Sequence, residues 1–201
     1  MTMTTANKVT IARIAFVPLF VAEIISYVNS GNERHRLAAI VCFALAALGD
    51  ALDGYIARRF HQQSELGAVL DPLADKLLLV SGIVLLSFDH QPRFNSIPLW
   101  LTGTIIGRDI LLLAGLLVVL MIVGKVKIRP RLLGKVATVL QMAIILWILL
   151  QWRARWLPAL CLAAALCTGI SGLLYIWDGT RLLSAHPASS PSEPAGAGSI
   201  D

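Results

Sequence analysis

Six long apolar stretches limit what this chain can fold into more than any other feature. They cover residues 10–29, 37–57, 66–88, 97–123, 133–152 and 156–177. Each is about as long as the roughly 20 residues that an α-helix needs to cross a lipid bilayer. Because 57% of the 201 residues are hydrophobic and only 14% are charged, these stretches use nearly the whole chain. The sequence therefore predicts an all-α, polytopic membrane protein with six transmembrane helices.

The predicted domain organisation is simple. Residues 1–184 form one six-helix membrane domain, and residues 185–201, which are rich in Pro, Ser, Gly and Ala, form a disordered tail. The first stretch carries Arg13 and Pro18 and is longer than the apolar region of a secretory signal, so we interpret it as a retained helix. The three cysteines fall inside predicted spans, where we expect inert buried thiols.

The net charge of +5 is best explained by membrane topology rather than by nucleic-acid binding. If the N-terminus is cytoplasmic, nine basic residues lie on the same side as the termini and five lie opposite. The nine are Lys8, Arg58, Arg59, Lys125, Lys127, Arg129, Arg131, Lys135 and Arg181, and the five are Arg34, Arg36, Arg93, Arg153 and Arg155. This bias predicts that both termini are cytoplasmic, because cytoplasmic loops carry an excess of Lys and Arg.

Four aspartates interrupt the apolar pattern at the predicted cytoplasmic end of the second and third helices. Asp50 and Asp53 are three residues apart, and Asp71 and Asp75 are four apart, so each pair shares one face of its helix. A carboxylate at mid-bilayer depth costs about 2.5 to 3.5 kcal/mol, and less near the interface. The nearby cations Arg58 and Lys76 leave the cluster negative. Oxygen ligands without His or Cys favour Mg²⁺, Mn²⁺ or Ca²⁺, so we predict a divalent metal site.

Small residues accompany these acids. Gly54 and Ala57 follow Asp53, and Gly67 precedes Asp71 by one turn. Small residues in membrane helices often permit close packing of neighbouring helices. The functional alternative is that they leave room for a flat ligand beside the metal. An ion-pair network or an ion pathway is a further alternative for the acids themselves.

The spacing of these residues resembles the signature of the CDP-alcohol phosphatidyltransferases. It is written Asp50-x2-Asp53-Gly54-x2-Ala57-Arg58-x8-Gly67-x3-Asp71-x3-Asp75, with all eight fixed positions matched. The resemblance extends over residues 5–183 and implies an integral, multi-pass enzyme. Such an enzyme joins an alcohol to the phosphatidyl group of CDP-diacylglycerol, releases CMP, and uses Mg²⁺ or Mn²⁺.

The resemblance also implies a role for each matched position. Asp50, Asp53 and Asp71 are expected to bind the metal and the diphosphate, and Asp75 is expected to bind metal and act as the catalytic base. The remaining positions are expected to bind the CDP-lipid: Gly54, Ala57 and Gly67 make room for the nucleotide, and Arg58 binds phosphate. The family resemblance further implies a homodimer in a bacterial inner membrane, with the site facing the cytoplasm.

The acceptor alcohol is less clearly encoded. Candidate acceptor-binding residues are Thr10 and Arg13 in the first helix, Arg108 in the fourth, and Lys135 and Thr138 in the fifth. Arg108 is the strongest candidate, because a buried arginine needs a partner: Asp109, an acid of the cluster, or a bound phosphate. Lys135 and Thr138 are one turn apart and are expected to face one pocket.

Two acceptors remain open. The stretch "GKVATVLQM" resembles the "GKxxTxxQ" segment of phosphatidylglycerophosphate synthases, whose acceptor is glycerol 3-phosphate. The Arg108–Asp109 pair resembles the CMP-forming cardiolipin synthases, which use phosphatidylglycerol. We favour glycerol 3-phosphate, because a basic loop suits a soluble phosphorylated acceptor. More distant alternatives are an intramembrane prenyltransferase, for which a second aspartate motif is missing, and an ion transporter.

Overall fold

The computed structural model describes the backbone of residues 5–60, 76–123 and 132–184, and the side chains of residues 14–49, 76–115, 132–178 and 180. The regular secondary structure of this part is all helical and contains no strand, which confirms the all-α part of the prediction. Its elements are α1 (Thr5–Ser30), α2 (Glu33–Phe60), a helix over Lys76–Leu85, α4 (Leu99–Val123), α5 (Leu132–Leu149), the short 3₁₀ helix η1 (Ala154–Trp156) and α6 (Leu157–Ser184).

The helices follow the predicted apolar stretches closely. Pro18 lies inside α1, and the helix continues through it to Ser30. The third stretch, predicted over 66–88, is helical in its described part until Leu85, and residues 66–75 lie outside the described residues. After Leu85 the chain turns. Ser87 Oγ donates a hydrogen bond to the carbonyl of Ile83 at 2.6 Å, and the carbonyl of Leu86 accepts from the amide of Ile97 at 2.8 Å.

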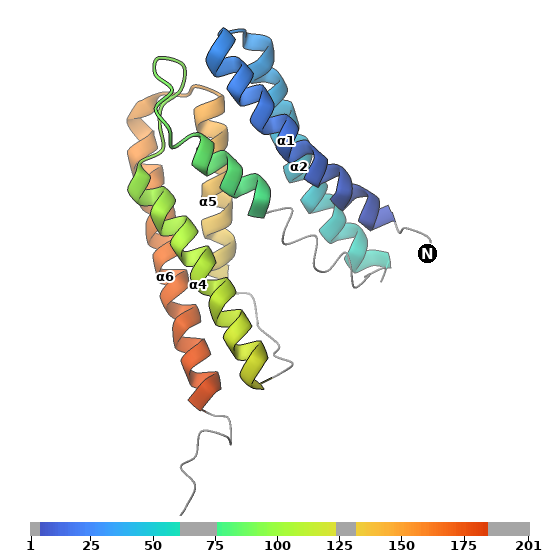
Figure 1. The fold of residues 1–201 in the computed structure, drawn as a ribbon, viewed down its shortest axis with the longest axis vertical. Helices are drawn as coiled ribbons and strands as arrows, with labels where there is room; N and C mark the ends of the chain where they lie inside the picture. Colours follow the sequence, from blue (N-terminus) through green and yellow to red (C-terminus); the bar gives the residue numbers. More distant parts are fainter. Residues whose placement is uncertain (1–4, 61–75, 124–131, 185–201) are drawn as a thin grey trace, which may run out of the picture.

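The helices pack as an elongated bundle (Figure 1). α1 runs along α2, α6 packs against both α4 and α5, and α2 touches α5. The core joins all of these elements: Phe20 of α1 lies 5.5 Å from Phe43 of α2, measured between ring centroids. Leu79 of the helix Lys76–Leu85 and Ile145 of α5 belong to the same buried cluster.

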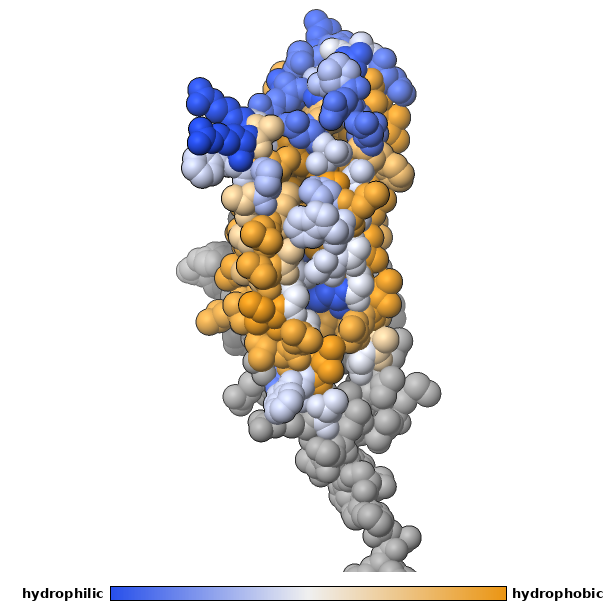
Figure 2. All heavy atoms as spheres, turned by 90° about the vertical axis from the view of Figure 1, so that its left-hand side faces the viewer, coloured by the Kyte–Doolittle hydropathy of each residue, from blue (hydrophilic) through white to orange (hydrophobic). Residues whose placement is uncertain are grey.

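Much of the outer surface of the bundle is apolar. Large hydrophobic side chains are exposed on every long helix, among them Leu45 on α2, Leu113 on α4, Val139 on α5 and Leu173 on α6. Figure 2 shows hydrophobic residues over the flanks of the bundle and hydrophilic residues at one end. Soluble monomers rarely expose apolar surface on this scale.

Two segments of the described chain are long and apolar enough to cross a membrane, Leu132–Leu149 and Ala154–Asp178. Together with the apolar flanks, they indicate that the protein associates with a membrane.

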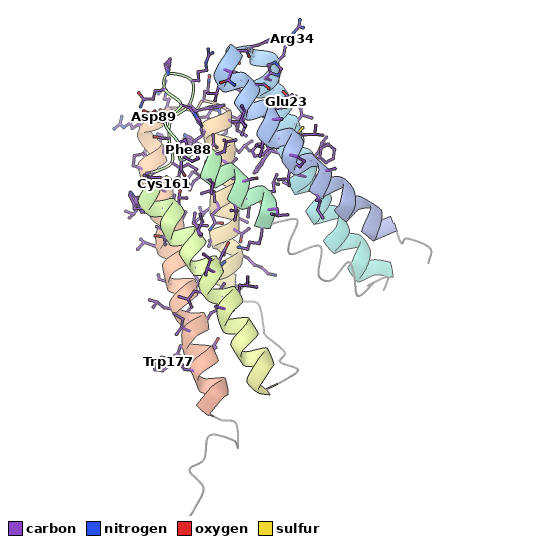
Figure 3. The ribbon with its side chains drawn as sticks, viewed as in Figure 1. Glu23, Arg34, Phe88, Asp89, Cys161 and Trp177 are labelled. Carbon is purple, nitrogen blue, oxygen red and sulfur yellow. The ribbon has the colours of Figure 1, made fainter. Side chains whose placement is uncertain are left out.

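Side chains tie together the loops at the hydrophilic end. Gly31, between α1 and α2, has a φ of +70°, and a Cβ on it would overlap the guanidinium of Arg93. That guanidinium lies 5.8 Å from the ring centroid of Tyr27. Gln151, after α5, donates from Nε2 to the Tyr27 hydroxyl at 2.8 Å and to the Arg93 carbonyl at 2.9 Å. Residues from three separate connections therefore form one structured end, where Figure 3 also shows Arg34 and Asp89.

Candidate active site

The predicted metal site falls largely outside the described residues. Asp50 and Asp53 lie on the described backbone of α2, three residues apart on one helix, but their side chains lie outside that part. The same holds for Gly54, Ala57 and Arg58. Gly67, Asp71 and Asp75 lie wholly outside the described residues. Among the side chains that the structure describes, no three His, Cys, Asp or Glu residues come together as a metal site.

The ends of the helices show where this site belongs in the bundle. α2 ends at Phe60, toward the end of the bundle at which α1 begins, α4 ends and α5 begins (Figure 1). The structured end with Gly31, Arg93 and Gln151 lies opposite. The acidic motif therefore begins on the half of α2 that leads away from the structured end.

A cluster of charged side chains joins the helix Lys76–Leu85 to α4. Lys76 Nζ donates to both carboxylate oxygens of Asp109, at 2.7 Å and 2.6 Å. Arg108 Nη1 donates to Asp109 Oδ1 at 2.8 Å. The side chains of Arg108 and Asp109 are 10% and 16% exposed, and that of Lys76 is 37% exposed. Among the described residues, two cations thus share one carboxylate, so these three side chains together carry an excess positive charge.

Arg108 is held from three sides. Its Nη2 donates to Ser171 Oγ of α6 at 3.1 Å. Its guanidinium passes over Gly134 of α5, where an added Cβ would lie 3.2 Å from Nη2. Its aliphatic stem passes over Gly172, where an added Cβ would lie 3.3 Å from Cγ. Glycine at both positions lets the arginine pack closely against α5 and α6.

One nitrogen of the Arg108 guanidinium makes no hydrogen bond to the described residues. That nitrogen is the buried Nε. An arginine with an unused donor, in a cluster with excess positive charge, is suited to an anionic ligand such as a phosphate.

The two predicted acceptor-site residues on α5 differ in their surroundings. Lys135 is exposed. Thr138 is half-buried, and its hydroxyl donates to the carbonyl of Gly134 at 3.1 Å, so its oxygen can still accept a hydrogen bond. Thr10 and Arg13 lie on the described backbone of α1, with side chains outside the described part.

A second polar contact continues along the interface of α5 and α6. Gln141 is 2% exposed and donates from Nε2 to Thr168 Oγ1 at 3.3 Å, while its Oε1 has no partner among the described residues. Thr168 and Ser171 are both fully buried and three residues apart on one face of α6. The sequence analysis missed both residues, although hydroxyls at this spacing in an apolar span are a recognisable sign of a polar helix interface.

Comparison with known proteins gives the family. Residues 3–171 match the model of the CDP-alcohol phosphatidyltransferases. A CDP-diacylglycerol–glycerol-3-phosphate 3-phosphatidyltransferase of Bacillus subtilis is 34% identical over 66% of this chain and 69% of its own length. The enzyme of the same name from Escherichia coli K12 is 29% identical over 89% of this chain and 92% of its own length. A CMP-forming cardiolipin synthase of Streptomyces coelicolor is 34% identical over 88% of this chain and 80% of its own length.

Proposed function

This chain belongs to the CDP-alcohol phosphatidyltransferase family, and we propose that it transfers the phosphatidyl group of CDP-diacylglycerol to glycerol 3-phosphate, giving phosphatidylglycerophosphate and CMP. The observation that supports glycerol 3-phosphate as the acceptor is the pairing of Lys76 and Arg108 with a single carboxylate among the described residues. This pairing leaves positive charge, and Arg108 Nε remains available to donate to a phosphate. The names of the relatives from B. subtilis and E. coli agree with this acceptor. Family membership favours a transferase over the ion-transporter and prenyltransferase alternatives.

We assign the CDP-lipid half of the site to the aspartate motif. Asp50, Asp53 and Asp71 would hold a divalent cation and the diphosphate, while Arg58 binds phosphate and Gly54, Ala57 and Gly67 leave room for the nucleotide. Asp75 would accept the proton of the attacking hydroxyl as a new phosphorus–oxygen bond forms. The phosphorus–oxygen bond to CMP breaks, and CMP leaves with its electron pair.

The residues present fit a Mg²⁺ or Mn²⁺ cofactor. All four acids supply the hard oxygen ligands that these ions prefer. Lys76, the cation that follows Asp75 in the sequence, donates to both carboxylate oxygens of Asp109, so at least part of its charge is paired outside the motif. When bound, the ion supplies positive charge that offsets the charge growing on the bridging oxygen.

The acceptor half is assigned to α1, α4 and α5. Arg108 would bind the phosphate of the acceptor, with Arg13 and the exposed Lys135 adding positive charge at the entrance. Thr10 and Thr138 are placed to bind hydroxyl groups, and the Thr138 oxygen remains free to accept a hydrogen bond.

A second acceptor is supported by one specific observation. The S. coelicolor relative, as similar to this chain as the B. subtilis one, is named a CMP-forming cardiolipin synthase. The Arg108–Asp109 pair also resembles that group. Phosphatidylglycerol is therefore the alternative acceptor, with cardiolipin as the product.

We further propose six transmembrane spans with both termini in the cytoplasm of a bacterial cell, in the inner membrane, and a homodimeric assembly. The apolar flanks of α1, α2, α4, α5 and α6 support several spans. The excess of basic residues on one side supports the orientation.

The deciding experiment is an acceptor screen with purified protein, CDP-diacylglycerol and Mg²⁺, in which CMP release is followed. We expect release with glycerol 3-phosphate and loss of activity when the metal is chelated. A product formed with phosphatidylglycerol alone would replace the first acceptor by the second.

The role of Asp75 has its own test. We expect the Asp75→Asn enzyme to bind CDP-diacylglycerol normally and to release CMP at least a hundredfold more slowly, because a general base contributes about 10²- to 10⁴-fold. Binding is measured directly with labelled CDP-lipid, and full activity of this variant would remove Asp75 from the role of base.

A further inference from the structure

Asp109 occupies an unusual place between two cations from different helices. Lys76 and Arg108 both donate to it, at 2.6 Å to 2.8 Å. We propose that Asp109 is a positioning residue, which connects the CDP-lipid half of the active site to the acceptor half. The proposal rests on the proposed function, in which Asp75 is the base and Arg108 binds the acceptor phosphate.

The contact with Lys76 links Asp109 to the CDP-lipid half. Lys76 follows Asp75 directly in the sequence and opens the described part of its helix. Both oxygens of Asp109 accept from its ammonium group, so the first described turn of that helix is tied to α4 across 33 residues of chain. Lys76 is the chain neighbour of Asp75, so this ion pair would fix the proposed base relative to α4. Removal of either partner breaks the same tie.

The contact with Arg108 links Asp109 to the acceptor half. One edge of the guanidinium is fixed by Asp109 through Nη1, and Nη2 is fixed by Ser171 of α6. The planar group therefore has a defined orientation, and its Nε has no partner among the described residues. Without the carboxylate, two neighbouring cations would repel each other, and the guanidinium of Arg108 would lose its fixed orientation.

The experiment is a double-mutant cycle on the full-length enzyme with the variants Asp109→Asn, Lys76→Gln and their combination. CMP release is measured with each substrate varied in turn. For Asp109→Asn we expect kcat to fall at least tenfold and the KM for glycerol 3-phosphate to rise several-fold, with the KM for CDP-diacylglycerol unchanged. Lys76→Gln should lower kcat by a similar factor, and the double variant should be no slower than the slower single variant.

Matched controls separate this role from a general loss of structure. Glu33→Gln removes the charge from a carboxylate that pairs with Arg36 at 2.7 Å near the structured end of the bundle. Asp89→Asn removes a charge in the loop at that same end (Figure 3). Both controls should leave all kinetic parameters unchanged. Asp109→Glu, which keeps the charge, should recover part of the lost kcat.

Several results would overturn the proposal. One is wild-type kcat in either single variant. Another is a cycle in which the two losses multiply independently, and a third is an equal rise in the KM of both substrates. If Asp109→Asn does not fold, Lys76→Gln decides the matter, because its side chain is over one-third exposed. Absence of CMP release from the wild-type enzyme with glycerol 3-phosphate would refute the acceptor of the proposed function instead, and the cycle would then be measured with phosphatidylglycerol.

Discussion

Replacing Gly134 by alanine tests the arrangement around Arg108 most directly. Gly134 is buried in the first turn of α5, and an added Cβ would lie 3.2 Å from Arg108 Nη2. The next contacts, 3.8 Å to the Tyr175 hydroxyl and 3.9 Å to Ser171 Oγ, are ordinary. The guanidinium must therefore move by a few tenths of an ångström, and it must move away from the helix that carries Lys135 and Thr138.

The two effects on stability oppose each other. Crowding a packed site costs about 1 kcal/mol at the low end of its usual range. Replacing glycine by alanine in a helix recovers up to about 1 kcal/mol. We therefore expect the free energy of unfolding to change by less than about 1 kcal/mol. Acceptor binding has no such compensating contribution, so we expect a measurable loss of affinity.

The functional effect follows from the hydrogen bonds that Arg108 makes. A hydrogen bond to a charged group contributes about 1.5 to 3 kcal/mol, so a misaligned bond to the acceptor phosphate loses about half of that. A loss of about 1.4 kcal/mol is tenfold in affinity. We expect the KM for glycerol 3-phosphate to rise by about three- to tenfold in Gly134→Ala.

The assay varies glycerol 3-phosphate at saturating CDP-diacylglycerol and follows CMP, with thermal unfolding in detergent measured alongside. The control is Gly107→Ala, which lies next to Arg108 in the chain and has open space around its added Cβ. An unchanged acceptor KM in a folded Gly134→Ala enzyme would refute the reasoning, as would an equal change in the control.

Three further predictions follow from single contacts. Arg108→Lys should raise the acceptor KM at least tenfold without unfolding the protein, because an ammonium cannot reach both Asp109 and Ser171 in one plane; steady-state kinetics measures this. Gly31→Ala should destabilise the fold by about 2 kcal/mol, because alanine is strained at this positive φ and its Cβ would displace the Arg93 guanidinium. Equilibrium unfolding measures this loss, and Gly103→Ala, whose added Cβ meets no atom, is the control. Gln141→Leu should change the free energy of unfolding by less than about 1 kcal/mol, because it removes an unpaired buried acceptor together with one long hydrogen bond; a large loss in the same experiment would show that Oε1 has a partner.

The sequence predicted the helices well because their limits depend on local hydropathy. It also predicted Asp109 as one of three possible partners of Arg108, and the structure confirms this one. The aspartate motif could be recognised because its meaning lies in spacing along two neighbouring helices. Its metal and catalytic roles remain predictions, since those side chains lie outside the described residues.

Contacts between distant helices could not be predicted in the same way. The sequence analysis named Lys76 only as a cation near the acids, and its contact with Asp109 depends on how α4 is rotated toward the helix Lys76–Leu85. Gly134 was part of a recognised segment, but its contact with Arg108 depends on the separation of α4, α5 and α6. Both contacts depend on how the helices pack, and a hydropathy pattern contains no information on packing.

The structured end formed around Gly31, Arg93 and Gln151 offers a way to report on the folded state. Its surface comes from three connections that are far apart in the chain and are held together by the contacts of Gln151 with Tyr27 and Arg93. An antibody fragment raised against this end would meet a discontinuous epitope, present only when all three connections are assembled. Such a reagent would distinguish intact enzyme from misassembled chains in a detergent extract without touching the end that carries the aspartates.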